Sequence, residues 1–265
     1  MADNRRGLPK INEVLIPILG LAGFISAWQI MAQFYDTFIL PSPLEVLERY
    51  IVFWQEDHSL SGHFLITFSE ACGGFLIGSL LALPLSYLIY RHPVLDRLLT
   101  PLVVGIQAVP IVALAPLLVI WFGFGLTSKI LIAALVAFFP VVTNGLVGLK
   151  ETDPRLRELL EIMGAGRREI FFKLEISSSL PVLFSGLKIG LTLSVIGAVV
   201  GEFSGSGKGL GYLVNLARGT FDTPLIFIGL IALAVLGFGF YTTLSLLEWL
   251  LMPWKRQSKN REGFS

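Results

Sequence analysis

The chain contains six windows of roughly 20 mostly apolar residues, and a window of that length suffices for a helix to cross a lipid bilayer. The windows lie at about residues 13–33, 65–90, 98–121, 128–149, 182–201 and 225–251. Hydrophobic residues make up 54% of the chain and charged residues only 15%, which is too apolar a composition for an ordinary soluble domain. We therefore expect an all-α, polytopic membrane protein with six transmembrane helices.

The distribution of Lys and Arg predicts the orientation of these helices, because positively charged loops stay preferentially in the cytoplasm. With the N-terminus inside, the cytoplasmic segments hold Arg5, Arg6, Lys10, Arg91, Arg97, Lys150, Arg155, Arg157, Arg167, Arg168, Lys173, Lys255, Arg256, Lys259 and Arg261. The outer loops hold Arg49, Lys129, Lys208 and Arg218. Both termini are therefore predicted to be cytoplasmic. Because no linker or internal repeat divides the sequence, we expect a single membrane domain over residues 1–265, with its core at about 64–250.

Residues 150–181 form the longest charged segment between the apolar windows. Charged side chains lie on both sides of Gly164-Ala165-Gly166, and glycine readily adopts the backbone conformations of a sharp turn. The segment therefore predicts a helix, a turn and a second helix on the cytoplasmic side. Apolar anchors for a partner would then be Ile170, Phe171, Phe172 and Leu174. The alternative is an amphipathic loop that only caps the bundle from inside.

The fifth window contains two pairs of glycines with four-residue spacing, namely Gly186 and Gly190, and Gly197 and Gly201. Small residues at this interval on a helix allow a neighbouring helix backbone to approach closely. The pattern is consistent with core packing within one chain and equally with packing across a two-fold interface between two copies. In either arrangement, the fifth helix lies near the centre of the protein.

A few polar residues fall inside or beside the predicted spans, where they could line a path for a solute. They are Gln107, Asn144, Thr192, Ser194 and Glu202. Hydrogen bonding between helices is the commoner role of the uncharged ones. Glu202 is either a pathway or gate residue, or a carboxylate at a helix end that pairs with Lys208 or Arg218. The carboxylates lie mostly at the predicted edges of spans, which argues against an ion-gradient-driven secondary transporter or channel.

The sequence offers no group of residues that predicts an enzyme. It has no phosphate-binding loop and no metal-ligand spacing, and its three histidines lie near the predicted aqueous edges. The glycine-rich outer stretch 199–212 follows a predicted span rather than a strand, so it does not fit a phosphate cradle. We expect no cofactor, no metal site and no nucleic-acid partner for this chain.

The charged segment resembles the EAA loop of ATP-binding-cassette importer permeases, in which a glutamate, a glycine and an apolar position follow at set intervals. Here these residues are Glu158, Gly164 and Leu174. The resemblance implies cytoplasmic coupling helices that dock onto a separate ATPase subunit, which would bind the ATP and Mg²⁺. The coupling residues implied in this chain are Glu158, Gly164, Ala165, Arg167 and Arg168. Ser177 stands where many members have proline, which puts the boundary between loop and fifth helix in question, whereas Pro181 matches a second common proline.

Other motifs, in the family's order, extend the resemblance from about residue 14 to residue 254. They are Leu40-Pro-Ser-Pro43, Pro110 and Pro116, Trp121-Phe-Gly-Phe-Gly125, Phe139-Pro140 with Asn144, residues 199–212, and Phe221-Asp-Thr-Pro224. This pattern is similar to permeases for sulfonates, nitrate or taurine and to their relatives for thiamine-precursor pyrimidines and riboflavin. It implies a type I importer permease fold in the bacterial inner membrane, a solute-binding protein outside the cell, and a second permease copy, most simply an identical one. The motifs in the outer loop tilt the expected solute towards a thiamine-precursor pyrimidine or riboflavin.

Overall fold

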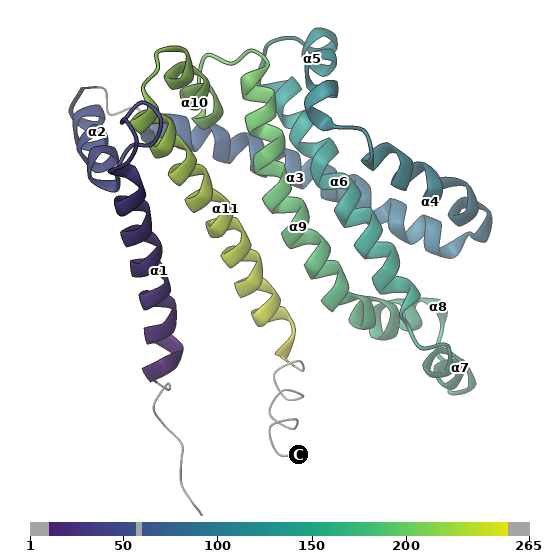
Figure 1. The fold of residues 1–265 in the computed structure, drawn as a ribbon. Coiled ribbons are helices and arrows are strands. Elements are labelled where there is room, and N and C mark those ends of the chain that lie inside the picture. The colour runs from purple at the N-terminus through teal and green to yellow at the C-terminus, as the bar shows by residue number, and fades with distance from the viewer. Residues whose placement is uncertain (1–10, 57–59, 254–265) are drawn as a thin grey trace, which may run out of the picture. The chain divides into compact units, whose positions relative to one another are not determined.

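The computed structural model describes residues 11–56 and 60–253, and every regular element in these ranges is helical (Figure 1). The elements are α1 (Ile11–Ala32), α2 (Pro43–Glu56), α3 (Leu60–Arg91), α4 (Pro93–Gln107), α5 (Ile111–Phe122), α6 (Leu126–Lys150), α7 (Pro154–Ile162), α8 (Arg167–Ile170), a π-helical turn η1 (Phe171–Glu175), α9 (Ile176–Phe203), α10 (Leu210–Gly219) and α11 (Thr223–Leu251). In the described residues, 5 helices are long and apolar enough to cross a membrane, or up to 6 if the bent pair α4 and α5 counts as one span. The all-α membrane fold is therefore confirmed.

The described residues fall into two compact units. The first contains α1, α2 and residues 214–230. The second contains residues 60–213 and the remainder of α11, and it includes all the predicted site residues. The division does not decide whether the chain behaves as one domain in the membrane, so the single domain stays a prediction.

In the first unit, the start of α2 is set by a capping box. The Ser42 backbone N–H donates to the Glu45 carboxylate at 2.6 Å, and the Glu45 N–H donates back to the Ser42 hydroxyl at 3.3 Å. This reciprocal pair satisfies two N–H groups that the first helical turn leaves without partners. The Thr37 hydroxyl also donates to Glu45. The guanidinium of Arg49, further along α2, pairs with Asp222 at 2.8 Å.

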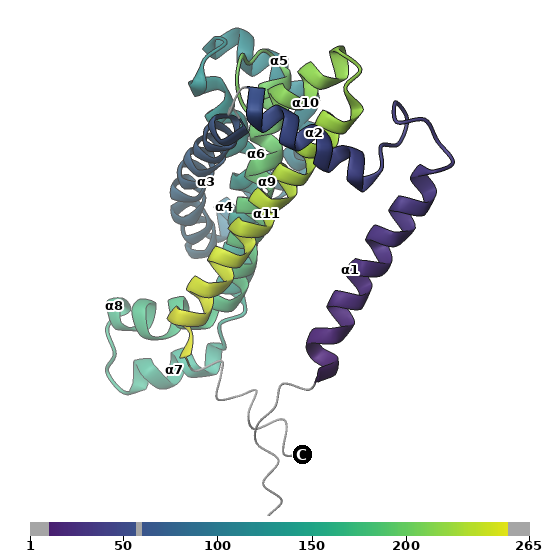
Figure 2. The ribbon, with the colours of Figure 1, turned by 90° about the vertical axis from the view of Figure 1, so that its left-hand side faces the viewer.

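The second unit is built around α6, which packs against both α3 and α9 (Figures 1 and 2). The close approach depends on small residues, because a Cβ added to Gly197 would lie 2.6 Å from the Cα of Ala133. One added to Gly186 would lie 2.5 Å from the Asn144 Cβ, and one added to Gly190 would lie 3.0 Å from the Ala137 carbonyl oxygen.

Gly201 likewise faces α6, with a Cβ position 3.1 Å from the Cα of Lys129. All four glycines predicted to mediate packing therefore contact α6 of the same chain. These contacts correspond to the first of the two arrangements that the sequence left open.

The predicted span at 98–121 is not one helix. It breaks at Ala108 to Pro110, and α4 and α5 meet there at an angle of 97°. Proline lacks an N–H to donate and disfavours helical geometry in the residue before it, so a helix ends readily at this point. Apolar composition alone did not reveal the break.

The predicted fifth span at 182–201 is too short. The helix continues without a break from Arg167 to Phe203, through the π-helical turn η1, so it incorporates the second half of the charged segment. Ser177 retains the N–H that a proline at this position would lack, which is compatible with an uninterrupted helix. The other predicted spans agree with the observed helices to within about five residues.

Candidate functional site

The charged segment forms a short helix, a tight turn and a second helix, as the sequence predicts. α7 begins where the Asp153 side chain accepts a hydrogen bond from the Arg155 N–H at 2.9 Å, with Pro154 at the first helical position. α7 ends at Ile162, and Gly164 in the turn that follows adopts a φ of 84°. The Ala165 N–H then donates to the Leu160 carbonyl at 2.9 Å. A positive φ strains residues with a side chain, so the turn depends on glycine at this position.

The five predicted coupling residues lie on this one protruding segment. Glu158 is exposed on α7, Gly164 and Ala165 form the turn, and Arg167 and Arg168 are exposed on the first turn of α8. α7 buries none of its residues. The exposed side chains of Leu156, Leu159, Ile162 and Met163 give this segment an uncovered apolar surface.

The predicted apolar anchors of the second helix have a different role. Ile170 and Leu174 are buried against the bundle, and only Phe172 is substantially exposed, at 55%. The Phe171 ring is half-buried and packs edge-on against Tyr87. The expected docking surface therefore lies more on α7 than on the second helix, because the second helix is continuous with α9 and shares its buried face.

A buried carboxylate that the sequence analysis did not single out lies at the base of this segment. Glu175 in η1 is 1% exposed and pairs with Arg157 of α7. The same guanidinium donates to the Tyr90 hydroxyl of α3 at 2.6 Å, and Arg91 lies 3.7 Å from the Glu175 carboxylate. The four residues line, or lie beside, a cavity of about 770 Å³ between α3 and the α7–α8 segment. In the sequence, Glu175 is one of several charges in a polar stretch, so no local signal marks it as buried.

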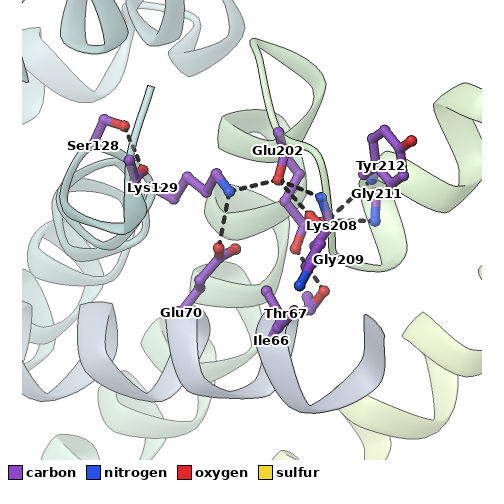
Figure 3. Close-up of polar contacts among 12 residues, drawn as sticks. Ile66, Thr67, Glu70, Ser128, Lys129, Glu202, Lys208, Gly209, Gly211 and Tyr212 are labelled. Carbon is purple, nitrogen blue, oxygen red and sulfur yellow. Dashed lines mark hydrogen bonds and ion pairs between the residues drawn. The ribbon is translucent and has the colours of Figure 1, made fainter. Parts of the chain in front are cut away.

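At the other end of the second unit, Glu202 anchors the glycine-rich loop to the bundle (Figure 3). Its carboxylate accepts hydrogen bonds from the backbone N–H groups of Gly211 and Tyr212, the latter at 3.2 Å, in the first turn of α10. It also accepts one from the Thr67 hydroxyl of α3 at 2.6 Å. Gly209 has a φ of 112°, and a side chain there would overlap the carboxylate. Glu202 is 1% exposed, and its described partners are backbone amides and a hydroxyl rather than the side chains of Lys208 or Arg218.

Beside Glu202 lies a second buried charge pair (Figure 3). Lys129, at the start of α6, is 7% exposed and places its Nζ atom 3.2 Å from Glu70 and 2.5 Å from the Ser206 hydroxyl. Glu70 is fully buried in α3. The carboxylates were expected mostly at the edges of spans, and Glu70, inside α3, is an exception. A signal was available, since Glu70 is the only charged residue between His63 and Arg91.

The remaining predicted pathway residues are dispersed. Gln107, at the end of α4, donates to the Thr143 hydroxyl at 3.2 Å and lines an apolar cavity of about 280 Å³ at the α4–α5 break. The Asn144 amide donates to the Pro140 carbonyl of its own helix at 2.8 Å. Ser194 is fully buried and donates to a carbonyl of α9. Of these residues, Gln107 alone is exposed at a cavity in this conformation.

Residues 11–56 and 60–253 contain no group of three or more His, Cys, Asp or Glu side chains that could hold a metal ion. The buried carboxylates are instead held by cations, hydroxyl groups and backbone amides, which is the chemistry of structural links.

The described residues thus contain five or six candidate membrane spans and an exposed helix–turn–helix segment with an uncovered apolar surface. Residues 74–256 match the family described as binding-protein-dependent transport system inner membrane component, and the chain belongs to that family. It is therefore the permease of an ATP-binding-cassette importer, a multi-pass membrane protein that is not itself an enzyme. Membership also implies an ATPase and a solute-binding protein as partners. The alternative of an ion-gradient-driven carrier is excluded.

Individual relatives are similar over most of the chain. The riboflavin transport system permease protein RibX of Chloroflexus aurantiacus is 44% identical over 223 residues, which cover 83% of this chain and 82% of RibX. The formylaminopyrimidine transport permease protein ThiX of Halalkalibacterium halodurans is 34% identical over 94% of this chain and 100% of its own length. The taurine transport system permease protein TauC of Escherichia coli is 28% identical over 93% of this chain and 92% of TauC.

Proposed function

We propose that two identical copies of this chain enclose the translocation pathway of an importer, and that residues 154–175 of each copy dock onto an ATPase subunit. The observation that carries the docking proposal is the uncovered apolar surface of α7. Ile162 is 84% exposed and Met163 is 72% exposed. Apolar side chains gathered on one protruding segment indicate a surface that a partner covers.

The charged coupling residues complement this apolar surface. Glu158, Arg167 and Arg168 are exposed around it, where they can pair with charges on the ATPase and set the register of docking. Gly164 and Ala165 form the tight turn between α7 and α8, so the segment presents a compact projection. When ATP closes the two ATPases, the docked segments move together and the spans switch between two packings as rigid bodies.

The solute is proposed to be a small heterocycle, either riboflavin or a formylaminopyrimidine-type precursor. The support comes from relatives, since RibX is 44% and ThiX 34% identical to this chain, whereas TauC is 28% identical. Sulfonates, taurine and nitrate are the second choice. Gln107, at the helix break, is the best-placed candidate for a pathway residue, whereas Ser194 and Glu202 are buried in this conformation.

The proposed setting is the bacterial plasma membrane, with both termini in the cytoplasm. This orientation follows from the basic segments and places α7 and α8 on the side of the ATPases. A single-domain permease forms a two-fold channel most simply as a homodimer. Two differently tagged copies should therefore copurify from cells that express both.

The docking proposal is tested by affinity purification of the tagged protein from its native membrane, followed by mass spectrometry. Wild type is compared with a Glu158→Arg, Gly164→Trp double variant, and a Glu48→Arg variant of the exposed residue on α2 is the control. We expect the ATPase to copurify with wild type and the control and to be lost from the double variant. Equal recovery of the ATPase with all three proteins would refute docking through this segment.

The solute proposal is tested with the solute-binding protein that copurifies. Its affinity for riboflavin, a formylaminopyrimidine and taurine is measured by isothermal calorimetry. Tight binding of either heterocycle supports the proposal, and a preference for taurine contradicts it.

A further inference from the structure

α7 has an unusual mechanical position for a helix that must transmit force. It buries none of its residues fully, and only Arg157 and Leu160 are half-buried, so apolar packing offers little to convey a displacement to the membrane spans. A cavity of about 770 Å³ lies between the α7–α8 segment and α3. If an ATPase moves α7, some other link has to carry the movement across this gap.

Arg157 provides such a link. Its guanidinium donates to the Tyr90 hydroxyl at the end of α3 at 2.6 Å and to the buried Glu175 carboxylate in η1. No other α7 side chain forms a hydrogen bond or ion pair with another helix in the part of the chain that the structure describes. One side chain therefore connects α7 to two of the three helices that form the core of the second unit.

Because Glu175 is buried, its ion pair with Arg157 resists separation. The residue is 1% exposed, and its second oxygen accepts no hydrogen bond from any described residue. A carboxylate removed from water in this way depends strongly on its hydrogen-bonded cation, because separation of the pair would leave the buried charge opposed by the more distant Arg91 alone. Arg91 lies 3.7 Å away, beyond hydrogen-bonding distance, so Arg157 is the close partner.

Arginine also suits the geometry better than lysine. Both hydrogen bonds come from one guanidinium nitrogen, Nη2, whose two N–H groups point in fixed directions in the guanidinium plane, whereas an ammonium is a point charge on a flexible stem. Glu175 is the last residue of η1, and the helix continues from there through α9 to Phe203 without a break. A displacement of α7 is thereby coupled to a long, continuous helix.

We infer that Arg157 is a positioning residue that transmits the movement of α7 to α3 and α9 through Tyr90 and Glu175. We call this set of three side chains the strut. The inference rests on the proposed docking of residues 154–175, and it adds that docking alone is insufficient for transport. Without the strut, the ATPase binds and hydrolyses ATP, but the membrane helices do not follow.

The test uses the complete complex with its ATPase in proteoliposomes and needs no knowledge of the solute. Cys72 is replaced by Ser, and Phe203, which is 49% exposed at the far end of α9, is replaced by Cys. The labelling rate of this cysteine by a membrane-impermeant thiol reagent is measured with and without ATP and vanadate. ATPase recovery and ATP hydrolysis are measured on the same preparations.

For an Arg157→Gln variant we expect unchanged ATPase recovery. The ATP-dependent change in the labelling rate should be at least about fivefold smaller than in wild type, because fivefold is the low end of typical coupling between two sites. Arg157→Lys should retain part of the response. The matched control is Arg155→Gln, which removes an exposed arginine from the same helix. It should respond like wild type.

Exchanging the charges of Arg157 and Glu175 distinguishes loss of the strut from misfolding of the protein. The Arg157→Glu, Glu175→Arg double variant restores an ion pair of reversed sign, so it should recover part of the response that either single variant loses. Recovery of this kind is not expected if the substitutions only disturb folding.

The possible failures are distinguishable. A full labelling response in Arg157→Gln with the ATPase still bound overturns the strut and leaves docking intact. A wild-type complex whose α9 cysteine shows no response to ATP also overturns the strut. Failure of wild type to retain the ATPase overturns the docking proposal and the strut with it.

Discussion

The anchoring role of Glu202 leads to a quantitative prediction. In the folded protein its carboxylate accepts hydrogen bonds from the N–H groups of Gly211 and Tyr212 and from the Thr67 hydroxyl. In a Glu202→Ala variant, the two backbone N–H groups in this buried region lose their acceptor. Each unsatisfied buried donor costs about 1–3 kcal/mol, so the free energy of unfolding should fall by about 2–6 kcal/mol.

The Glu202→Gln variant isolates the contribution of charge, since it preserves the shape and one acceptor oxygen. Hydrogen bonds to a charged group contribute about 1.5–3 kcal/mol and those to a neutral group about 0.5–1.5 kcal/mol, so a loss of about 1–3 kcal/mol is expected. For a chain of this size, 1 kcal/mol corresponds to about 2–4 °C in Tm. The expected fall in Tm is therefore about 5 °C for Glu202→Gln and larger for Glu202→Ala.

The assay combines thermal unfolding in detergent with hydrogen exchange of the backbone amides. The amides of residues 211 and 212 should lose protection in both variants, because their acceptor is weakened or removed. A Glu151→Gln variant serves as the control, since Glu151 is an exposed acid in a turn. Unchanged protection of these two amides, together with a Tm within about 1 °C of wild type, would show that Glu202 does not anchor α10.

Two other substitutions test the packing and the capping box. Gly197→Leu should lower the yield of monodisperse protein and reduce the free energy of unfolding by at least about 1–3 kcal/mol, because the new side chain meets the backbone of Ala133. The control is Gly239→Leu, where an added Cβ meets nothing within 4 Å. Equal yield and Tm for the two variants would contradict the packing argument. The hydrogen bond from Thr37 and then the one from the Ser42 N–H hold the pKa of Glu45 below its ordinary value of 4.5. A group with a lowered folded-state pKa stabilises the protein above its unfolded-state pKa and loses that contribution as pH falls through the folded-state pKa. Tm measured from about pH 6 to pH 3 should therefore fall less in Glu45→Gln than in wild type, and parallel curves for the two proteins would contradict this assignment.

The sequence determined the membrane fold and the general position of the coupling segment. A run of about 20 apolar residues has few alternatives to a transmembrane helix, because a bilayer offers no partners for unpaired backbone groups. Gly164 could be placed in a turn because glycine alone adopts a positive φ without strain. These inferences depend on local composition and on backbone chemistry, which neighbouring segments change little.

Local pattern was insufficient where the outcome depended on competing effects. The apolar run at 98–121 contains three prolines, Pro101, Pro110 and Pro116, and two of them lie inside the helices. Only at Pro110 does the chain break. Composition cannot distinguish a proline that a helix accommodates from one that ends it, since neighbouring helices decide whether the freed carbonyl groups find partners.

The pairing of the buried charges was decided by the tertiary structure alone. Glu70 meets Lys129, and Arg157 meets Glu175, because the packing of α3, α6 and α9 brings residues together that are 59 and 18 positions apart in the chain. Many pairings of these acids and bases satisfy the sequence equally well. The interior selects one, because a charge that is removed from water is stable only where the fold places a partner within a few ångströms.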